Sequence, residues 1–333
     1  MQTTATETTK PTPTQKKERT PKEFIGLVLR GMAMGASDIV PGVSGGTMAF
    51  ILGIYEELID SIRAVGQPEL IQAALKFKIK DIFRILNWQF LIAVAVGIFI
   101  SILTMSRGLE WLLINQPIYL WSFFFGLVLA SIFTVSKRIP KWTPSLYGVM
   151  LLGAVGAFFL VGAVPLQTPN AWWFLFLSGA LAICAMILPG ISGAFILVLL
   201  GKYQFVLSAL NNRDIVSIML IGLGAVIGLV TFAQIIGFFF KRYHNGTVAV
   251  LIGLMVGSLR KIWPWKEDVG WLEEAGEFVL DSEGHRVVTE QVIRLPEFGT
   301  SAGLTEFGIA LLLALVGFGA ILLLDRLAGD KGE

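Results

Sequence analysis

Two copies of a Pro-Gly-x-Ser-Gly segment are the residues in this chain whose types and spacing are best suited to chemistry. The first copy is PGVSG at 41–45 and the second is PGISG at 189–193, each between apolar runs. Pro-Gly ends an incoming helix and Ser-Gly opens an outgoing one, so the first backbone N–H groups of the outgoing helix lack intrahelical partners. Such a helix start attracts anions through its free donors and its partial positive charge. The pattern predicts an anion-binding tip at each copy.

The side chains of each tip fit this prediction. Ser44 and Ser192 are suited to capping or to hydroxyl donation, and the glycines beside them let a ligand approach the backbone closely. One isolated copy is more often only a tight turn between two helices. Because both copies keep the same four residues in register, we expect a shared functional tip. The candidate tip residues are Pro41, Gly42, Ser44, Gly45, Gly46, Thr47, Pro189, Gly190, Ser192 and Gly193.

Ionisable residues near the tips add further candidates. Asp38 lies three residues before the first Pro-Gly break and is expected to face a polar cavity, with capping of the tip amides or pairing with Arg30 as the alternative. Lys202 follows the second tip by about two turns, where it could pair with phosphate or extend its ammonium group to the membrane surface. Glu56 is read from the residues alone as an interfacial salt-bridging group.

The sequence argues against an enzyme. The histidines His244 and His285 fall in two loops, which the membrane topology predicted below places on opposite sides of the membrane. No Ser/His/Asp constellation therefore forms from them. No phosphate-binding loop of the Walker type, metal-spaced His/Cys cluster or dinucleotide fingerprint occurs. The lone Cys184 is expected to be a packing residue. We therefore expect no catalytic residues, no cofactor, no metal site and, without a basic face carrying aromatics, no nucleic-acid partner.

The elements that must position the tips are membrane helices. The chain has 333 residues, of which 55% are apolar and 15% charged, and its mean hydropathy is +0.73. Apolar runs close to the roughly 20 residues of a membrane-spanning helix predict an all-α polytopic membrane protein. The predicted segments lie near 24–40, 47–62, 89–106, 117–136, 144–164, 171–188, 194–210, 215–240, 246–259 and 303–324.

The second half of the sequence repeats the first. PGVSGGTMAFILGIY at 41–55 aligns without a gap on PGISGAFILVLLGKY at 189–203, and 97–135 aligns more weakly on 224–262. Each repeat is predicted to be a helical hairpin, re-entrant or nearly spanning, followed by three transmembrane helices. The predicted parts are a disordered cytoplasmic tail at 1–23, repeats at 24–164 and 165–325, a polar insert at 263–302 within the second repeat, and a C-terminal tail at 326–333.

Charge distribution predicts the orientation, because Lys and Arg in short loops favour the cytoplasm. The predicted inside segments carry Lys10, Lys16, Lys17, Arg19, Lys22, Arg63, Lys76, Lys78, Lys80, Arg84, Lys137, Arg138, Lys141, Lys241 and Arg242, and the predicted outside loops carry Arg107, Arg213 and the acidic insert. A hairpin plus three crossings is an odd unit, so the second repeat should be inverted relative to the first. Both termini are predicted inside and the insert outside, with substrate handled near the midplane.

The two tip segments and the residues around them resemble those of a known bacterial family. ASDIVPGVSGGTMAFILGIYEELI at 36–59 and ILPGISGAFILVLLGKY at 187–203 resemble the bacterial polyprenyl-phosphate transporter family of PopT type, over about 24–325. The resemblance implies an inner-membrane protein that moves undecaprenyl phosphate, the lipid carrier of cell-wall precursors, from the outer to the cytoplasmic leaflet. It implies site roles for Asp38, Glu56 and Tyr203 besides the tip residues.

The sequence departs from internal symmetry at the tips, because Ala194 and Phe195 replace Gly46 and Thr47. The two half-sites are therefore not expected to bind identically. The alternative to a lipid-phosphate translocase is an ion-coupled transporter of a small soluble anion that uses the same tips. The coupling ion, a proton or a cation, is left open, as are the lipid chain length, the oligomeric state and the role of the insert.

Overall fold

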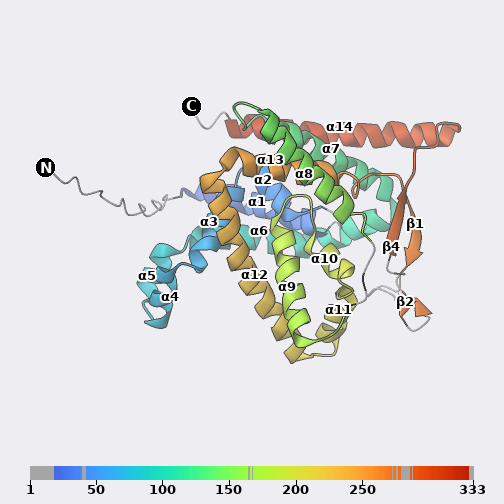
Figure 1. Cartoon of the computed structure of the whole chain (residues 1–333). Helices are drawn as coiled ribbons and strands as arrows, with labels where there is room; N and C mark the ends of the chain where they lie inside the picture. The colour runs from blue at the N-terminus through green and yellow to red at the C-terminus, as the bar shows by residue number, and fades with distance from the viewer. Residues whose placement is uncertain are drawn as a thin grey trace.

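The computed structural model describes residues 19–39, 43–163, 166, 168–271, 273–274, 277–278, 286 and 288–329. Its helices are α1 (Pro21–Ile39), α2 (Gly45–Ile51), α3 (Tyr55–Val65), α4 (Pro68–Leu75), α5 (Ile79–Ile85), α6 (Trp88–Asn115), α7 (Pro117–Ser136), α8 (Pro144–Leu160), α9 (Trp172–Ile187), α10 (Gly193–Leu199), α11 (Tyr203–Asn211), α12 (Ile215–Arg242), α13 (His244–Ser258) and α14 (Ser301–Gly329) (Figure 1). By length and composition, α6, α7, α12 and α14 are able to cross a membrane, and α10 with α11 forms a further apolar pair bent by 108°. The prediction of a polytopic helical membrane protein is confirmed.

Each outgoing arm of the predicted hairpins is broken once. The segment expected at 47–62 consists of α2 and α3, and the one expected at 194–210 consists of α10 and α11. The breaks hold Gly53 at φ +72° and Gly201 at φ +61°, in the left-handed region that glycine adopts without steric cost. A left-handed residue ends an α-helix, so the two aligned glycines end both short helices.

The described part of the polar insert contains short strands, so the all-α description holds for the membrane helices and not for the insert. It contains β1 (Lys266–Trp271), β2 (Glu273–Glu274), β3 (Glu277–Phe278) and β4 (Val288–Ile293), with β1 antiparallel to β4 and β2 to β3. The sequence VTEQVI of β4 begins and ends with β-branched residues and has no helix-forming run. Between α3 and α6, a connecting segment contains the short helices α4 and α5.

Helix packing recurs between the two halves of the chain. The first helix of each hairpin packs on the long helix that follows, α1 on α6 and α9 on α12, and the remaining pairs are exchanged between halves, α7 with α14 and α8 with α13. At aligned positions, a Cβ on Gly97 would meet the Val28 carbonyl and a Cβ on Gly224 would meet the Phe176 carbonyl. Only glycine permits these close helix contacts, so an aligned glycine allows close packing in both the α1–α6 pair and the α9–α12 pair.

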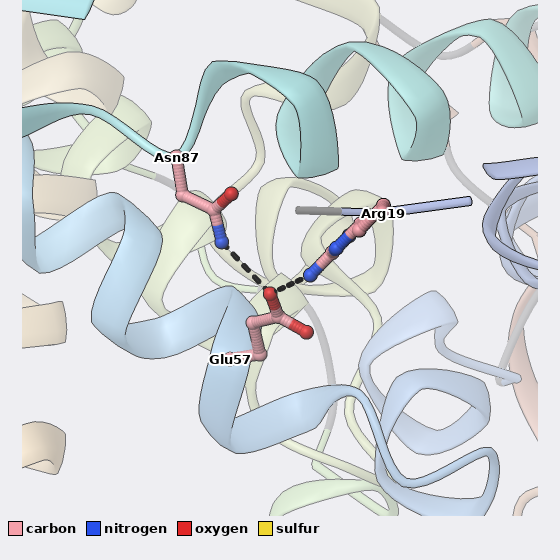
Figure 2. A network of polar contacts seen from close by, with 3 residues as sticks. All are labelled: Arg19, Glu57 and Asn87. Carbon is pink, nitrogen blue, oxygen red and sulfur yellow. Dashed lines mark hydrogen bonds and ion pairs between the residues drawn. The ribbon is translucent and has the colours of Figure 1, made fainter. Parts of the chain in front are cut away.

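The two connecting segments lie at opposite ends of the molecule. Figure 1 shows α4 and α5 at one end and the β1–β4 pair at the other, with α14 beginning near the strands and running across toward the end that holds α4. At the α4 end the Glu57 carboxylate of α3 accepts hydrogen bonds from Arg19 and, at 2.8 Å, from Asn87 (Figure 2). Residues 19–23, expected in the tail, are thus attached to the helical body, and α1 begins at Pro21.

Candidate functional site

The two predicted tips contact each other directly. The Ser44 hydroxyl, 1% exposed, donates to the Met186 carbonyl at 3.0 Å and accepts from the Gly46 N–H at 3.1 Å. The Thr47 hydroxyl accepts from the Gly190 N–H at 2.8 Å. The start of α2 therefore meets the end of α9 and the Pro-Gly turn that follows it, inside the helical body.

Helix electrostatics favour this contact. The N-terminus of α2 carries partial positive charge, and the carbonyl groups that end α9 carry partial negative charge. A Cβ on Gly46 would clash with the Ile187 carbonyl, so only glycine lets the two helix ends come this close. The same arrangement means that the α2 terminus is partly neutralised by protein carbonyls before any ligand arrives.

Asp38 supplies an anion to the first tip. Its carboxylate accepts a hydrogen bond from the Gly45 N–H at 2.7 Å, and a Cβ on Gly45 would contact that carboxylate. With Gly46 bonded to Ser44, the first two donors of α2 are both engaged by side chains. An external anion that uses the Gly45 donor must displace the Asp38 carboxylate. Pro41 and Gly42, the remaining candidates of this tip, lie outside the described residues.

The second tip is built differently. Ser192 precedes α10 as its N-cap, but its side chain makes no capping hydrogen bond, and among the described residues its hydroxyl has no partner. Pro189 and Gly190 are buried, and Gly190 adopts φ +88°, which favours glycine. Gly193 packs on α9, since a Cβ there would lie 2.6 Å from the Ala182 carbonyl. This tip therefore keeps a hydroxyl that is free for a ligand.

Lys202 is 1% exposed and lies at the start of α11, immediately before Tyr203. Its ammonium group donates to the Thr168 carbonyl at 2.7 Å and to the Asn170 side chain at 2.6 Å, and lies 5.5 Å from the centre of the Phe174 ring. These contacts join the segment before α9 to the start of α11. This contact could not be predicted from the sequence, because neither Thr168 nor Asn170 belongs to a motif.

Glu56 does not share the tip contact. It is exposed and lines a separate surface hollow between α3 and α12, together with Ile59, Asp60, Gly237, Phe240 and Lys241. Near it, Arg63 of α3 donates to the Gln234 side chain at 2.8 Å, and Gln234 donates back to the Arg63 carbonyl at 2.8 Å. This reciprocal pair joins the two halves. A lone Gln within the apolar run at 215–240 was the signal that could have revealed it.

The chain is similar to known proteins over most of its length. Residues 34–279 match the family model described as undecaprenyl phosphate translocase-like, a range that includes Asp38 and both tips. The chain belongs to this family. It is 40% identical over 307 residues to the polyprenyl-phosphate transporter of Vibrio cholerae serotype O1, covering 92% of this chain and 97% of that protein.

A second relative is more distant. The chain is 29% identical over 256 residues to the polyprenyl-phosphate transporter of Staphylococcus aureus, covering 71% of this chain and 85% of that protein. No solved structure shows significant similarity to the chain. The resemblance carried by the paired tip motifs is therefore confirmed at the level of the family.

Proposed function

We propose that this member of the undecaprenyl phosphate translocase-like family moves a polyprenyl phosphate from the outer to the cytoplasmic leaflet of the bacterial inner membrane, which recycles the carrier for cell-wall synthesis. The family match and the printed names of both relatives support the substrate class. The observation that carries the mechanism is the contact of Ser44 and Thr47 with Met186 and Gly190. It brings polar groups from both halves together among apolar helices.

The proposal includes two repeats of opposite orientation. The recurring packing of α1 on α6 and α9 on α12, with the exchange of α7 and α8 between halves, supports it. So does the separation of α4 and α5 from the β1–β4 pair in Figure 1. Under this proposal both termini face the cytoplasm and the insert faces outside. The contacting tips then lie near the midplane, where inverted-repeat transporters handle their substrates.

We propose that Asp38 occupies the place of the substrate's negative charge at the first tip. A carboxylate and a phosphate monoester both accept hydrogen bonds from backbone N–H groups at a helix start. When Asp38 is protonated or turns away, the Gly45 donor becomes available to a headgroup. Ser192, whose hydroxyl is not used for capping, is the proposed donor from the second tip. Exchange between carboxylate and headgroup also gives a route for coupling transport to a proton or cation.

The test is reconstitution of the full chain into liposomes that contain undecaprenyl phosphate in one known leaflet. A leaflet-resolved assay should show the phosphate headgroup crossing faster than in protein-free liposomes, with the lipid recovered chemically unchanged. A parallel arm with inorganic phosphate inside the liposomes measures soluble-anion transport. Phosphate flux without lipid movement would identify a soluble-anion transporter instead, and altered lipid would identify an enzyme.

A further inference from the structure

A basic hollow at the end of α13 belongs to neither tip. Its basic lining residues are Arg260 and Lys261, from the segment that joins α13 to β1, and Lys266, the first residue of β1. The rest of its lining comes from three other places: Val161, Gly162 and Ala163 after α8, Phe195 in the first turn of α10, and Glu290, Gln291 and Ile293 of β4. The insert thus forms one wall of the hollow and the second hairpin forms another.

The cationic groups are held by neutral partners. The Lys266 ammonium donates to the Lys261 carbonyl at 2.7 Å and lies 3.6 Å from the centre of the Trp121 ring. The Lys261 ammonium lies 5.0 Å from the centre of the Phe195 ring and 3.5 Å from the Gln291 amide oxygen. Carbonyl, amide and aromatic contacts orient these ammonium groups without neutralising their charge.

Acidic side chains near the hollow compensate its positive charge only in part. Glu290 lines the hollow, and Asp268 uses its carboxylate to accept from Gln291 at 2.7 Å. In the described part of the chain, the ion pairs are Arg19–Glu57 and Arg294–Glu267, so no carboxylate pairs with the three basic residues of the hollow. The hollow therefore carries net positive charge next to an apolar wall.

Burial disfavours the charged forms of both lysines. Burial and the neighbouring Lys261 lower the pKa of Lys266 to about 7, although Asp268 opposes the shift. Burial also lowers the pKa of Lys261. A half-buried pair of ammonium groups that no carboxylate contacts directly is costly, and a bound anion lowers that cost.

We propose that Arg260, Lys261 and Lys266 form a binding site for the phosphate headgroup of a polyprenyl lipid, beside the second tip. A guanidinium with two ammonium groups suits the geometry and charge of a phosphate monoester. Phe195, which lines the hollow, gives adjoining apolar surface for the first isoprene units. This inference rests on the proposed function and adds to it a loading site, outside the tip contact, on the side where the insert lies.

The test measures binding of farnesyl phosphate, a short polyprenyl phosphate, to the purified full chain in nanodiscs. Lys261→Gln and Lys266→Gln should each lower affinity roughly 3- to 10-fold, the scale of one lost charge-assisted contact at a partly exposed site. Arg286→Gln is the matched control, because Arg286 lies in the same insert over Phe278 and does not line the hollow. Measured one pH unit below the pKa of Lys266, Lys266→Arg keeps the charge and should keep the affinity, which separates the loss of charge from the loss of the lysine side chain itself.

Two further ligands test whether the site recognises the phosphorylated lipid or only a free phosphate ion. Inorganic phosphate should compete with farnesyl phosphate, and neutral farnesol should bind equally to wild type and to both Gln variants. Binding of inorganic phosphate without farnesyl phosphate would overturn the lipid assignment. If the wild type transports the lipid, and if Lys261→Gln and Lys266→Gln change neither affinity nor transport, the proposed binding site is wrong and the proposed function stands. Charge-sensitive farnesyl phosphate binding in a chain that does not transport would leave the site standing and refute the proposed function.

Discussion

Thr47 accepts a hydrogen bond from the Gly190 N–H at 2.8 Å, and this bond joins the first tip to the Pro-Gly turn of the second. The position aligned with Thr47 in the second half is Phe195, which lies instead against Lys261 at the basic hollow. The two halves therefore use equivalent positions for different purposes. The first stabilises the contact between tips, and the second lines the proposed loading site.

The first prediction concerns this bond. Thr47→Val keeps the shape of the side chain but leaves the buried Gly190 N–H without its acceptor, which should cost about 1–3 kcal/mol of stability. Thr47→Ser restores an acceptor and should recover most of that loss. Thermal unfolding of the purified chain in one detergent measures both variants. Equal unfolding temperatures for Val and wild type would show that the bond does not hold the tips together.

The second prediction concerns Asp38. Asp38→Asn keeps an oxygen that can accept from the Gly45 N–H but removes the negative charge. Folding and membrane insertion should be preserved while transport of undecaprenyl phosphate is lost, because the exchange between carboxylate and headgroup no longer operates. Proteoliposome transport and size-exclusion behaviour are measured on the same preparation. Transport at the wild-type rate would reduce Asp38 to a structural cap of α2.

The third prediction separates the two serines. Ser44 caps α2 and bonds to the Met186 carbonyl, so Ser44→Ala should lower stability by about 0.5–2 kcal/mol, the range for a lost N-cap. Ser192 makes no capping bond, so Ser192→Ala should leave stability nearly unchanged and lower the affinity for farnesyl phosphate. Unfolding and binding measured in parallel distinguish the roles. Similar losses of stability in both variants would contradict the asymmetry between the tips.

The sequence predicted the helices far better than their contacts. Apolar runs and Pro-Gly breaks located the membrane helices, because length and composition determine a membrane span largely by themselves. The breaks at Gly53 and Gly201 were missed because single glycines are tolerated within apolar runs. The strands of the insert were missed because short polar strands carry little periodic signal. Helix pairing could not be predicted from the sequence either. The packing of α7 on α14 and of α8 on α13 depends on contacts between residues far apart in the chain.

The candidate site was predicted in part. The tip motifs identified residues that the structure brings together, but the hydrogen bonds of Ser44 and Thr47 to the opposite tip depend on packing that no local pattern encodes. The basic hollow did have a signal. Arg260 and Lys261 directly precede the insert that is predicted to be outside, and Lys266 lies within it, on the side where the charge rule disfavours basic residues. Basic residues that contradict the predicted topology are themselves candidates for function.

The fourth prediction tests the orientation of the repeats. In a chain carrying Cys184→Ser, a cysteine placed at Gly299 should react with an impermeant thiol reagent in intact spheroplasts, since that position is exposed and has no atoms near its Cβ direction. A cysteine placed at the exposed Lys76 of the α4–α5 link should react only after lysis. The reverse pattern would refute the proposed orientation, and labelling of both positions before lysis would refute the opposite placement of the two segments.

The last prediction uses the acid–base behaviour of Lys266. Its pKa of about 7 leaves roughly nine-tenths of the side chains protonated one unit below that value and roughly one-tenth one unit above it. Arginine stays protonated throughout this range. Wild type and Lys266→Arg should therefore bind farnesyl phosphate equally at the lower pH, and the Arg variant should bind more tightly at the higher pH.

Comparing the two proteins removes the ligand's own titration, because the phosphate gains negative charge over the same range and affects both alike. The groups around Lys266 are also common to both, namely Lys261 and Asp268 with Arg260 and Glu290 in the lining. A bound anion raises the pKa of Lys266, so the difference should be measured at ligand concentrations below saturation. An affinity ratio that stays constant between the two pH values would mean that Lys266 does not change charge in the hollow as the anion binds.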